Sequence, residues 1–119
     1  MALVLIVDDS SFQRRMIRNI VAGDGYETIE AGDGGAGIEM AAAHTPDCML
    51  MDLLMPGVSG LEALATLHDQ GNTIPVIILT SDIQESVREQ CLDLGARAFL
   101  NKPPKAEELL GAIRTVLES

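Results

Sequence analysis

Residues 3–9 read Leu-Val-Leu-Ile-Val-Asp-Asp, a run of five apolar residues that ends in two acids. A strand with one face in water alternates apolar and polar residues, whereas an unbroken apolar run is typical of a parallel strand covered on both faces. Similar runs recur along the chain, the second and fifth of them shorter or more mixed. We therefore predict strands over residues 2–8, 26–31, 47–52, 74–80 and 98–100.

Helical patterns occupy the intervals between these runs. Apolar residues recur there every three or four positions, as on the buried face of a helix. The predicted helices cover about 11–22, 35–43, from 59 onward, 84–94 and 106–117. Ser10 or Ser11 is the expected N-cap of the first helix, and Gly95 ends the fourth. The fifth helix is expected to bury Leu109, Leu110, Ile113, Val116 and Leu117.

Five strand–helix repeats imply a doubly wound α/β fold, because right-handed crossovers lay helices on both faces of a parallel sheet. The 119 residues fit a single domain over 1–119. Hydrophobic residues make up 47% of the chain but aromatic residues only 3%, so the core must be aliphatic.

The overall composition excludes several classes of function. A net charge of −10 argues against a basic face for nucleic acid. No apolar stretch approaches the ~20 residues needed to span a membrane. Asp8 and Asp9 interrupt the first apolar run, so we expect no signal peptide. Cys48 and Cys91 fit buried free thiols in a reducing cytoplasm, which is where we expect the protein.

Polar side chains follow the predicted strands at their carboxyl ends, the edge where open parallel sheets bind ligands. Asp8 and Asp9 end the first strand, and Asp52 ends the third. The fourth ends in Thr80-Ser81-Asp82 and the fifth in Asn101-Lys102. If the first and third strands are neighbours, three carboxylates converge at one point.

Such a cluster of acids favours a divalent cation. Three nearby anions repel one another, and Mg²⁺ prefers oxygen ligands while keeping several waters. Thr80 could donate its hydroxyl to a phosphate, and Lys102 could add a positive charge. These are the parts needed for phosphoryl transfer to a carboxylate. A single Asp at a strand end is more often a helix N-cap, so the prediction depends on the joint placement.

The chain resembles the receiver domain of two-component response regulators from Leu3 to about Leu117. The resemblance is carried by residues 5–9, 51–60, 76–80, 95–96 and 99–103. It implies a flavodoxin-like sheet of five parallel strands in the order 2-1-3-4-5. It also implies a phosphorylation-dependent signalling switch that acts in a phosphorelay and is not an enzyme, although it assists its own phosphorylation and slow dephosphorylation. A free-standing chemotaxis-type regulator is the leading interpretation.

The resemblance also implies a role for each residue of the cluster. Asp52 would accept the phosphoryl group from a sensor histidine kinase or phosphotransfer protein. Asp9, Asp52 and the backbone carbonyl of Leu54 would bind Mg²⁺ directly, with Asp8 acting largely through water. Thr80 and Lys102 would bind the incoming phosphoryl group.

A conformational switch is the expected output of this site. Phe99 matches the aromatic switch position, which turns inward when Thr80 moves toward the phosphate. A downstream protein target would bind the face formed by the fourth helix, fifth strand and fifth helix. The Lys102–Pro103 bond is often cis in this family. Leu54 stands where many relatives carry a polar residue, so we expect slow self-dephosphorylation.

Two alternative functions remain open from the sequence. The first is a Mg²⁺-dependent phosphohydrolase with an aspartyl-phosphate intermediate. Such enzymes of the haloacid-dehalogenase type carry a second Asp where this chain has Leu54. The second is a nucleotide-binding module, because residues 32–37 form a literal GxGxxG after a predicted strand. Asp33 would place a negative charge against a bound pyrophosphate, so a tight turn into the second helix is the preferred interpretation.

Overall fold

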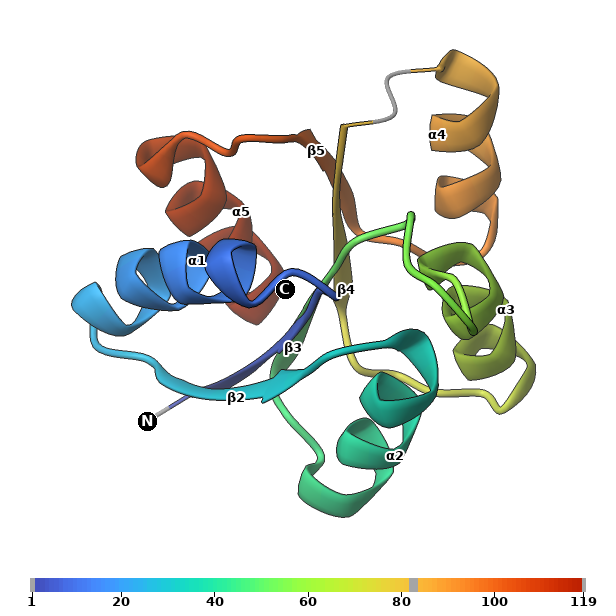
Figure 1. The fold of residues 1–119 in the computed structure, drawn as a ribbon, viewed down its shortest axis with the longest axis horizontal. Helices are drawn as coiled ribbons and strands as arrows, with labels where there is room; N and C mark the ends of the chain where they lie inside the picture. The colour runs from blue at the N-terminus through green and yellow to red at the C-terminus, as the bar shows by residue number, and fades with distance from the viewer. Residues whose placement is uncertain (1, 82–83, 119) are drawn as a thin grey trace.

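The computed structural model describes residues 2–81 and 84–118. Five strands form one parallel sheet in the order β2-β1-β3-β4-β5, which confirms the predicted fold (Figure 1). Each strand lies inside its predicted range, except that the last extends one residue further. The strands are β1 (Leu3–Val7), β2 (Glu27–Ala31), β3 (Cys48–Met51), β4 (Val76–Thr80) and β5 (Ala98–Asn101).

Helices follow the strands as expected, and each predicted end lies within one residue of the observed one. They are α1 (Ser11–Gly23), α2 (Gly34–His44), α3 (Gly60–Asp69), α4 (Glu85–Asp93) and α5 (Ala106–Glu118). Ser10 is the N-cap of α1, because its hydroxyl accepts a hydrogen bond from the Gln13 N–H at 3.2 Å. The Lys102–Pro103 peptide bond is cis, as the family resemblance implied.

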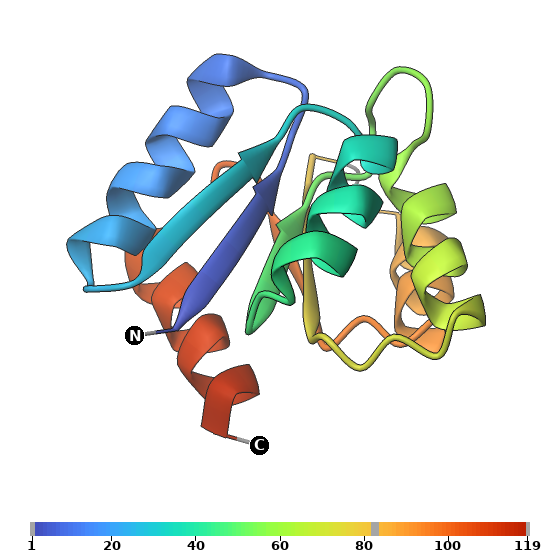
Figure 2. The same cartoon turned by 90° about the horizontal axis from the view of Figure 1, so that it is seen from below.

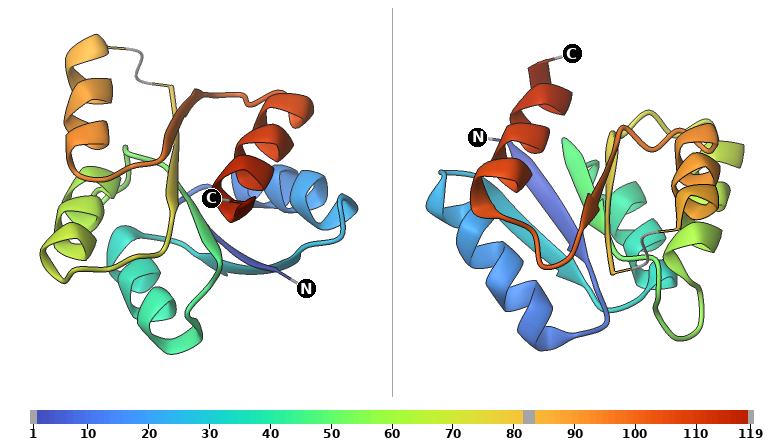
Figure 3. Two further views of the ribbon diagram at one scale, coloured as in Figure 1. Left: turned by 180° about the vertical axis from the view of Figure 1, so that it is seen from behind. Right: turned by 90° about the horizontal axis from the view of Figure 1, so that it is seen from above.

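Two apolar cores lie on opposite faces of the sheet. Leu5 and Val7 of β1 face α2, α3 and α4, whereas Val4 and Ile6 face α1 and α5. Figures 1 and 3 show this division, with α1 and α5 side by side on one face and the other three helices on the second. Because every central strand is covered on both faces, the chain needs the unbroken apolar runs seen in its sequence.

The buried face of α5 is narrower than predicted. Leu109, Ile113 and Val116 are buried, whereas Leu110 and Leu117 are only half-buried. The three buried residues repeat at intervals of four and three, which keeps them on one line along the helix. Leu110 and Leu117 lie on the flank of that line, so they are less buried than the sequence predicted.

The parallel register places the ends of three strands at the same level. Val7 is opposite both Ala31 of β2 and Met51 of β3. Figure 2 shows β1 and β2 running side by side in one direction. Continuing the register by one residue places Asp8 beside Asp52, at the carboxyl edge of the sheet.

The loop after β3 is fixed by close backbone contact with α3. Ser59 caps α3 with a reciprocal capping box to Glu62. The Gly60 N–H donates to the Leu53 carbonyl at 2.9 Å. A Cβ on Gly60 would lie 1.9 Å from the backbone oxygen of Asp52, so this position requires glycine.

Two further expectations concern the cysteines and membrane association. Cys48 and Cys91 are both buried free thiols, as predicted. Within residues 2–81 and 84–118, no helix has the length and apolar character to cross a bilayer.

Candidate functional site

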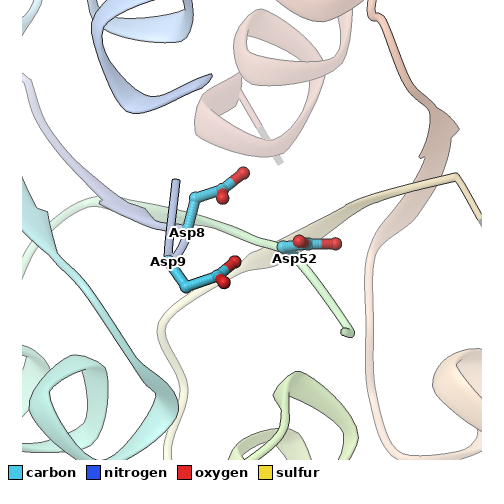
Figure 4. Close-up of side chains that lie close together, drawn as sticks. All are labelled: Asp8, Asp9 and Asp52. Carbon is cyan, nitrogen blue, oxygen red and sulfur yellow. The ribbon is translucent and has the colours of Figure 1, made fainter. Parts of the chain in front are cut away.

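Three carboxylates meet at the carboxyl edge of β1 and β3. One oxygen from each of Asp8, Asp9 and Asp52 lies within 4.8 Å of the others (Figure 4). Asp8 and Asp52 are buried, with 2% and 8% of their surface exposed, whereas Asp9 is exposed. The predicted convergence of acids from separate segments is therefore observed.

Backbone hydrogen bonds hold the two buried acids in place. The Asp8 N–H donates to the Ala31 carbonyl at 3.1 Å, and the Asp52 N–H donates to the Val7 carbonyl at 3.0 Å. These bonds continue the sheet ladder by one residue on either side of β1. The Asp8 carboxylate also accepts a hydrogen bond from the Ser10 N–H at 2.9 Å, which begins the turn into α1.

Lys102 reaches the acids from the loop after β5. Its Nζ contacts Asp8 Oδ2 and lies 3.2 Å from Asp52 Oδ2, and its side chain is only 11% exposed. The Lys102 N–H donates to the Thr80 carbonyl at 2.9 Å, which extends the β4–β5 pairing to this residue. The partly buried ammonium of Lys102 thus pairs with both buried carboxylates.

Burial governs the protonation of Asp52. Removal from water raises the pKa of its carboxyl group, and the Asp8 charge acts in the same direction. The Lys102 ammonium and a backbone hydrogen bond from Leu54 lower the pKa but do not cancel the effect of burial. An added cation would offset this cost, because it would stabilise the ionised form.

The remaining predicted site residues lie around the same edge. Thr80 is fully buried at the end of β4, opposite Asn101, and Phe99 is half-buried against the core on the α4 side. Leu54 is 63% exposed in the loop two residues after Asp52. Asp82, the last residue of the predicted polar group after β4, lies outside the described residues.

The donor set at this edge fits Mg²⁺. All three converging side chains offer carboxylate oxygens, which are the ligands this ion prefers, and no nitrogen or sulfur donor belongs to the described cluster. The exposed Asp9 leaves one side open to water, as an ion that keeps several waters requires.

Packing explains two of the glycines of residues 32–37, Gly34 and Gly37. A Cβ on Gly34 would lie 2.5 Å from the Val58 carbonyl oxygen, and one on Gly37 would lie 3.0 Å from the Val7 side chain. The Asp33 carboxylate accepts the Ala36 N–H at 2.8 Å, so it occupies the N-terminus of α2 that a pyrophosphate would need. The glycines therefore bring α2 close to its neighbours.

These features are those of a signalling receiver. The chain belongs to the response regulator receiver domain family, which matches residues 4–114. Receiver domains serve as phosphorylation-dependent switches in two-component signalling. They generally bind Mg²⁺ at a cluster of acidic residues, which here consists of Asp8, Asp9 and Asp52.

Particular relatives extend this assignment. The chain is 39% identical to Protein PilH of Pseudomonas aeruginosa over 119 residues, covering 98% of both chains. It is 38% identical to Response regulator MprA of Mycobacterium leprae, covering 96% of this chain but 50% of MprA. It thus spans about half the length of the MprA relatives. Among solved structures, it resembles a chain of the CheX–CheY–BeF₃–Mg²⁺ complex of Borrelia burgdorferi, with 28% identity, a TM-score of 0.92 and coverage of 97% and 88%.

The structure adds two residues that the sequence did not single out. Arg14 on α1 and Glu30 on β2 form an ion pair of 3.1 Å, and Arg14 also donates to the Asp8 carbonyl at 2.6 Å. In the sequence, Arg14 stands beside Arg15 and resembles any charged residue on a solvated helix face. Only the folded arrangement brings it to the turn that carries the acids.

Proposed function

We propose that Asp52 accepts the phosphoryl group in this receiver. A phosphohistidine of a partner kinase or phosphotransfer protein would donate it. The N–P bond breaks as an Asp52 oxygen bonds to phosphorus, giving an acyl phosphate and a free imidazole. The observation that carries the proposal is the convergence of Asp8, Asp9 and Asp52 around an edge reached by Lys102.

Asp9, Asp52 and the backbone carbonyl of Leu54 would hold Mg²⁺, with Asp8 acting through water. When bound, the ion supplies positive charge that offsets the repulsion between the carboxylates and the transferring phosphoryl oxygens. The CheX–CheY complex, which contains BeF₃ and Mg²⁺, supports this assignment by similarity. Asp8 is already engaged by the Ser10 N–H and by Lys102, which suits a supporting role.

Lys102 and Thr80 would bind the phosphoryl oxygens. The Lys102 ammonium lies beside Asp52 Oδ2, so it could pair with the oxygens of a phosphoryl group attached to Asp52. Thr80 ends β4 next to β3, the strand that Asp52 directly follows, and Phe99 lies on the neighbouring β5. A shift of Thr80 toward the phosphate would open space into which the Phe99 ring turns.

The face of α4, β5 and α5 would transmit this change to a downstream protein. Helix α4 is suited to move because it buries only Cys91 among its nine residues. The expected setting is the cytoplasm, where histidine kinases present their phosphohistidine.

Phosphorylation by a small phosphodonor tests the assignment. The protein is incubated with acetyl phosphate and Mg²⁺, and intact mass is measured against Asp52→Asn. The unmodified chain should gain the mass of one phosphoryl group in a Mg²⁺-dependent way, and Asp52→Asn should not. The matched control is Asp93→Asn, an exposed acid at the end of α4, which should behave as the unmodified chain. Equal phosphorylation of Asp52→Asn would refute the proposal.

A further inference from the structure

We propose that Arg14 is a positioning residue that fixes the Asp8–Asp9 peptide for Mg²⁺ binding, acting together with Glu30. The inference rests on the proposed function, because it assigns a role toward the same ion. Arg14 would contact neither the phosphoryl group nor the metal. Its role is to hold the backbone that presents the acids.

The contacts of Arg14 tie three segments together. Its Nη1 donates to the Asp8 carbonyl at 2.6 Å, and its Nε donates to Glu30 Oε1 at 3.1 Å. The same Nη1 would lie 3.6 Å from a Cβ on Gly32. The guanidinium therefore spans from α1 over the end of β2 to the turn after β1. Its side chain is 21% exposed and that of Glu30 is 28% exposed, so both partners are partly shielded from water.

The bond to the Asp8 carbonyl matters because that carbonyl belongs to the peptide joining Asp8 to Asp9. The Asp8 N–H donates to the Ala31 carbonyl, and the Asp8 carboxylate accepts from the Ser10 N–H. The Asp8 carbonyl is held by Arg14. Among the hydrogen bonds of the described residues, none restrains the exposed Asp9 side chain. The direction in which Asp9 points therefore depends on the orientation of the peptide before it.

The guanidinium is suited to this task by its shape. Its planar fork donates in two directions at once, whereas a lysine ammonium is a single point charge on a flexible stem. Glu30 sets the plane of the fork, and its second oxygen accepts from Arg18 Nη1 at 2.9 Å. Arg18 thus shares Glu30 with Arg14, but the bond to the Asp8 carbonyl comes from Arg14.

This difference between the two arginines supplies a matched control. Arg14→Met removes the bond to the Asp8 carbonyl and one bond to Glu30. Arg18→Met removes only the second bond to Glu30. Both variants lose one positive charge and one ion pair with Glu30, so the effect of the lost charge is common to both. Only Arg14→Met should disturb the Asp8–Asp9 peptide.

The experiment measures the Mg²⁺ dissociation constant by calorimetric titration and the denaturant midpoint in chelator, for each variant of the full chain. Arg14→Met should weaken Mg²⁺ binding about tenfold, the lower end for groups that orient metal ligands. Arg18→Met should leave the constant within about twofold, even where its midpoint falls as far as that of Arg14→Met. Equal weakening by both variants, or an unchanged constant in Arg14→Met, would overturn the proposal.

Two further variants keep the test decisive. Arg14→Lys retains the charge but cannot make both bonds, so it should bind Mg²⁺ as weakly as Arg14→Met. A dissociation constant equal to that of the unmodified chain would show that charge alone matters and would overturn the proposal. If Arg14→Met does not fold, Glu30→Gln replaces it, because the amide releases the plane of the guanidinium. Weaker Mg²⁺ binding by Glu30→Gln would support the proposal, and an unchanged constant would overturn it.

Failure of this inference is distinguishable from failure of the proposed function. If the unmodified chain binds no Mg²⁺ and takes up no phosphate, the proposed function itself is wrong. If it does both and Arg14→Met binds Mg²⁺ equally well, only the positioning role is wrong. Phosphorylation of Arg14→Met at saturating Mg²⁺ should approach that of the unmodified chain, because Arg14 does not contact the phosphoryl group.

Discussion

The ammonium of Lys102 lies 3.2 Å from Asp52 Oδ2 and also contacts Asp8 Oδ2, although 94 positions separate Lys102 from Asp8 in the chain. Only 11% of the lysine side chain is exposed, so solvent screens its ion pairs with Asp8 and Asp52 only weakly. The ammonium therefore neutralises part of the charge that a divalent ion would otherwise neutralise. Lys102 would therefore compete with a bound Mg²⁺ for the same carboxylates.

Lys102→Met should bind Mg²⁺ more tightly than the unmodified chain. Removing the competing cation raises the negative potential at the acids, so we expect affinity to rise about threefold to tenfold. Without metal, the buried acids lose their counter-charge, and the variant should be less stable by about 3 kcal/mol. Mg²⁺ should restore most of that loss. The measurements are titration calorimetry and denaturant unfolding with and without chelator; weaker Mg²⁺ binding in the variant would contradict this account.

Asp52→Asn should stabilise the metal-free protein at neutral pH. Burial raises the pKa of Asp52, so the folded state holds this proton more tightly than the unfolded state. The stabilisation from protonated Asp52 is complete below the unfolded pKa of about 3.9 and is lost as pH rises through the folded value. The variant should therefore unfold at a higher denaturant concentration at pH 7, and the gap should narrow toward about pH 4. A gap of the same size at both pH values would rule out this explanation.

The fold was predictable because buried parallel strands and amphipathic helices leave strong periodic signals. The runs ending at Asp8, Asp52 and Thr80 were visible as strands, and acids at the ends of neighbouring strands must meet. The pairing of Lys102 with both acids could not be read from the sequence, because it depends on where the loop after β5 places one flexible side chain. The sequence led us to expect Lys102 on the phosphoryl group, and the structure shows its ammonium paired with the carboxylates of Asp8 and Asp52.

Arg14 and Gly60 illustrate the same limit. Each acts through a contact with the backbone of the turn or loop that precedes its own helix, and backbone contacts leave no trace in the pattern of residue types. Gly60 belongs to a stretch that resembles the family, but glycine is required there because the Asp52 carbonyl leaves no room for a Cβ. In the sequence Arg14 resembles a solvated charge, whereas in the fold it forms an ion pair with Glu30 of β2.

Leu54→Asn should shorten the lifetime of the phosphorylated state. Leu54 lies two residues after Asp52 and is 63% exposed, so its apolar side chain stands at the solvent side of the site. An amide there could hydrogen-bond a water and orient it toward phosphorus, which leucine cannot do. Loss of phosphate, followed by intact mass after removal of acetyl phosphate, should become several-fold faster. Leu92→Asn on α4 is the control, and an unchanged rate in Leu54→Asn would count against a role for this position.

Cys48 should make the protein less stable at high pH. Burial, with a smaller contribution from Asp47, raises the pKa of its thiol to about 12. The thiol of the unfolded chain ionises near about pH 8.5. The stability that the protonated thiol contributes is therefore complete below about that pH. It falls as the pH rises toward about 12, by up to about 1.4 kcal/mol per pH unit. Unfolding free energies between pH 8 and 10.5 should fall less steeply in Cys48→Ala. Parallel slopes in the two proteins would contradict the prediction.

Gly60 and Gly111 should respond in opposite directions to the same added methyl group. In Gly60→Ala the new Cβ would lie 1.9 Å from the Asp52 carbonyl oxygen and 2.7 Å from the Leu53 Cα, so backbone must move. In Gly111→Ala, within α5, the new Cβ meets nothing within 4 Å. We expect Gly60→Ala to lose about 3 kcal/mol of stability and most Mg²⁺-dependent phosphorylation, because α3 pushes on the loop that carries Asp52. Gly111→Ala should gain about 0.5–1 kcal/mol, since alanine restricts the unfolded chain and favours helix. Denaturant unfolding measures both, and a Gly60→Ala protein that is as stable and as readily phosphorylated as the unmodified chain would show that this contact does not hold the site in place.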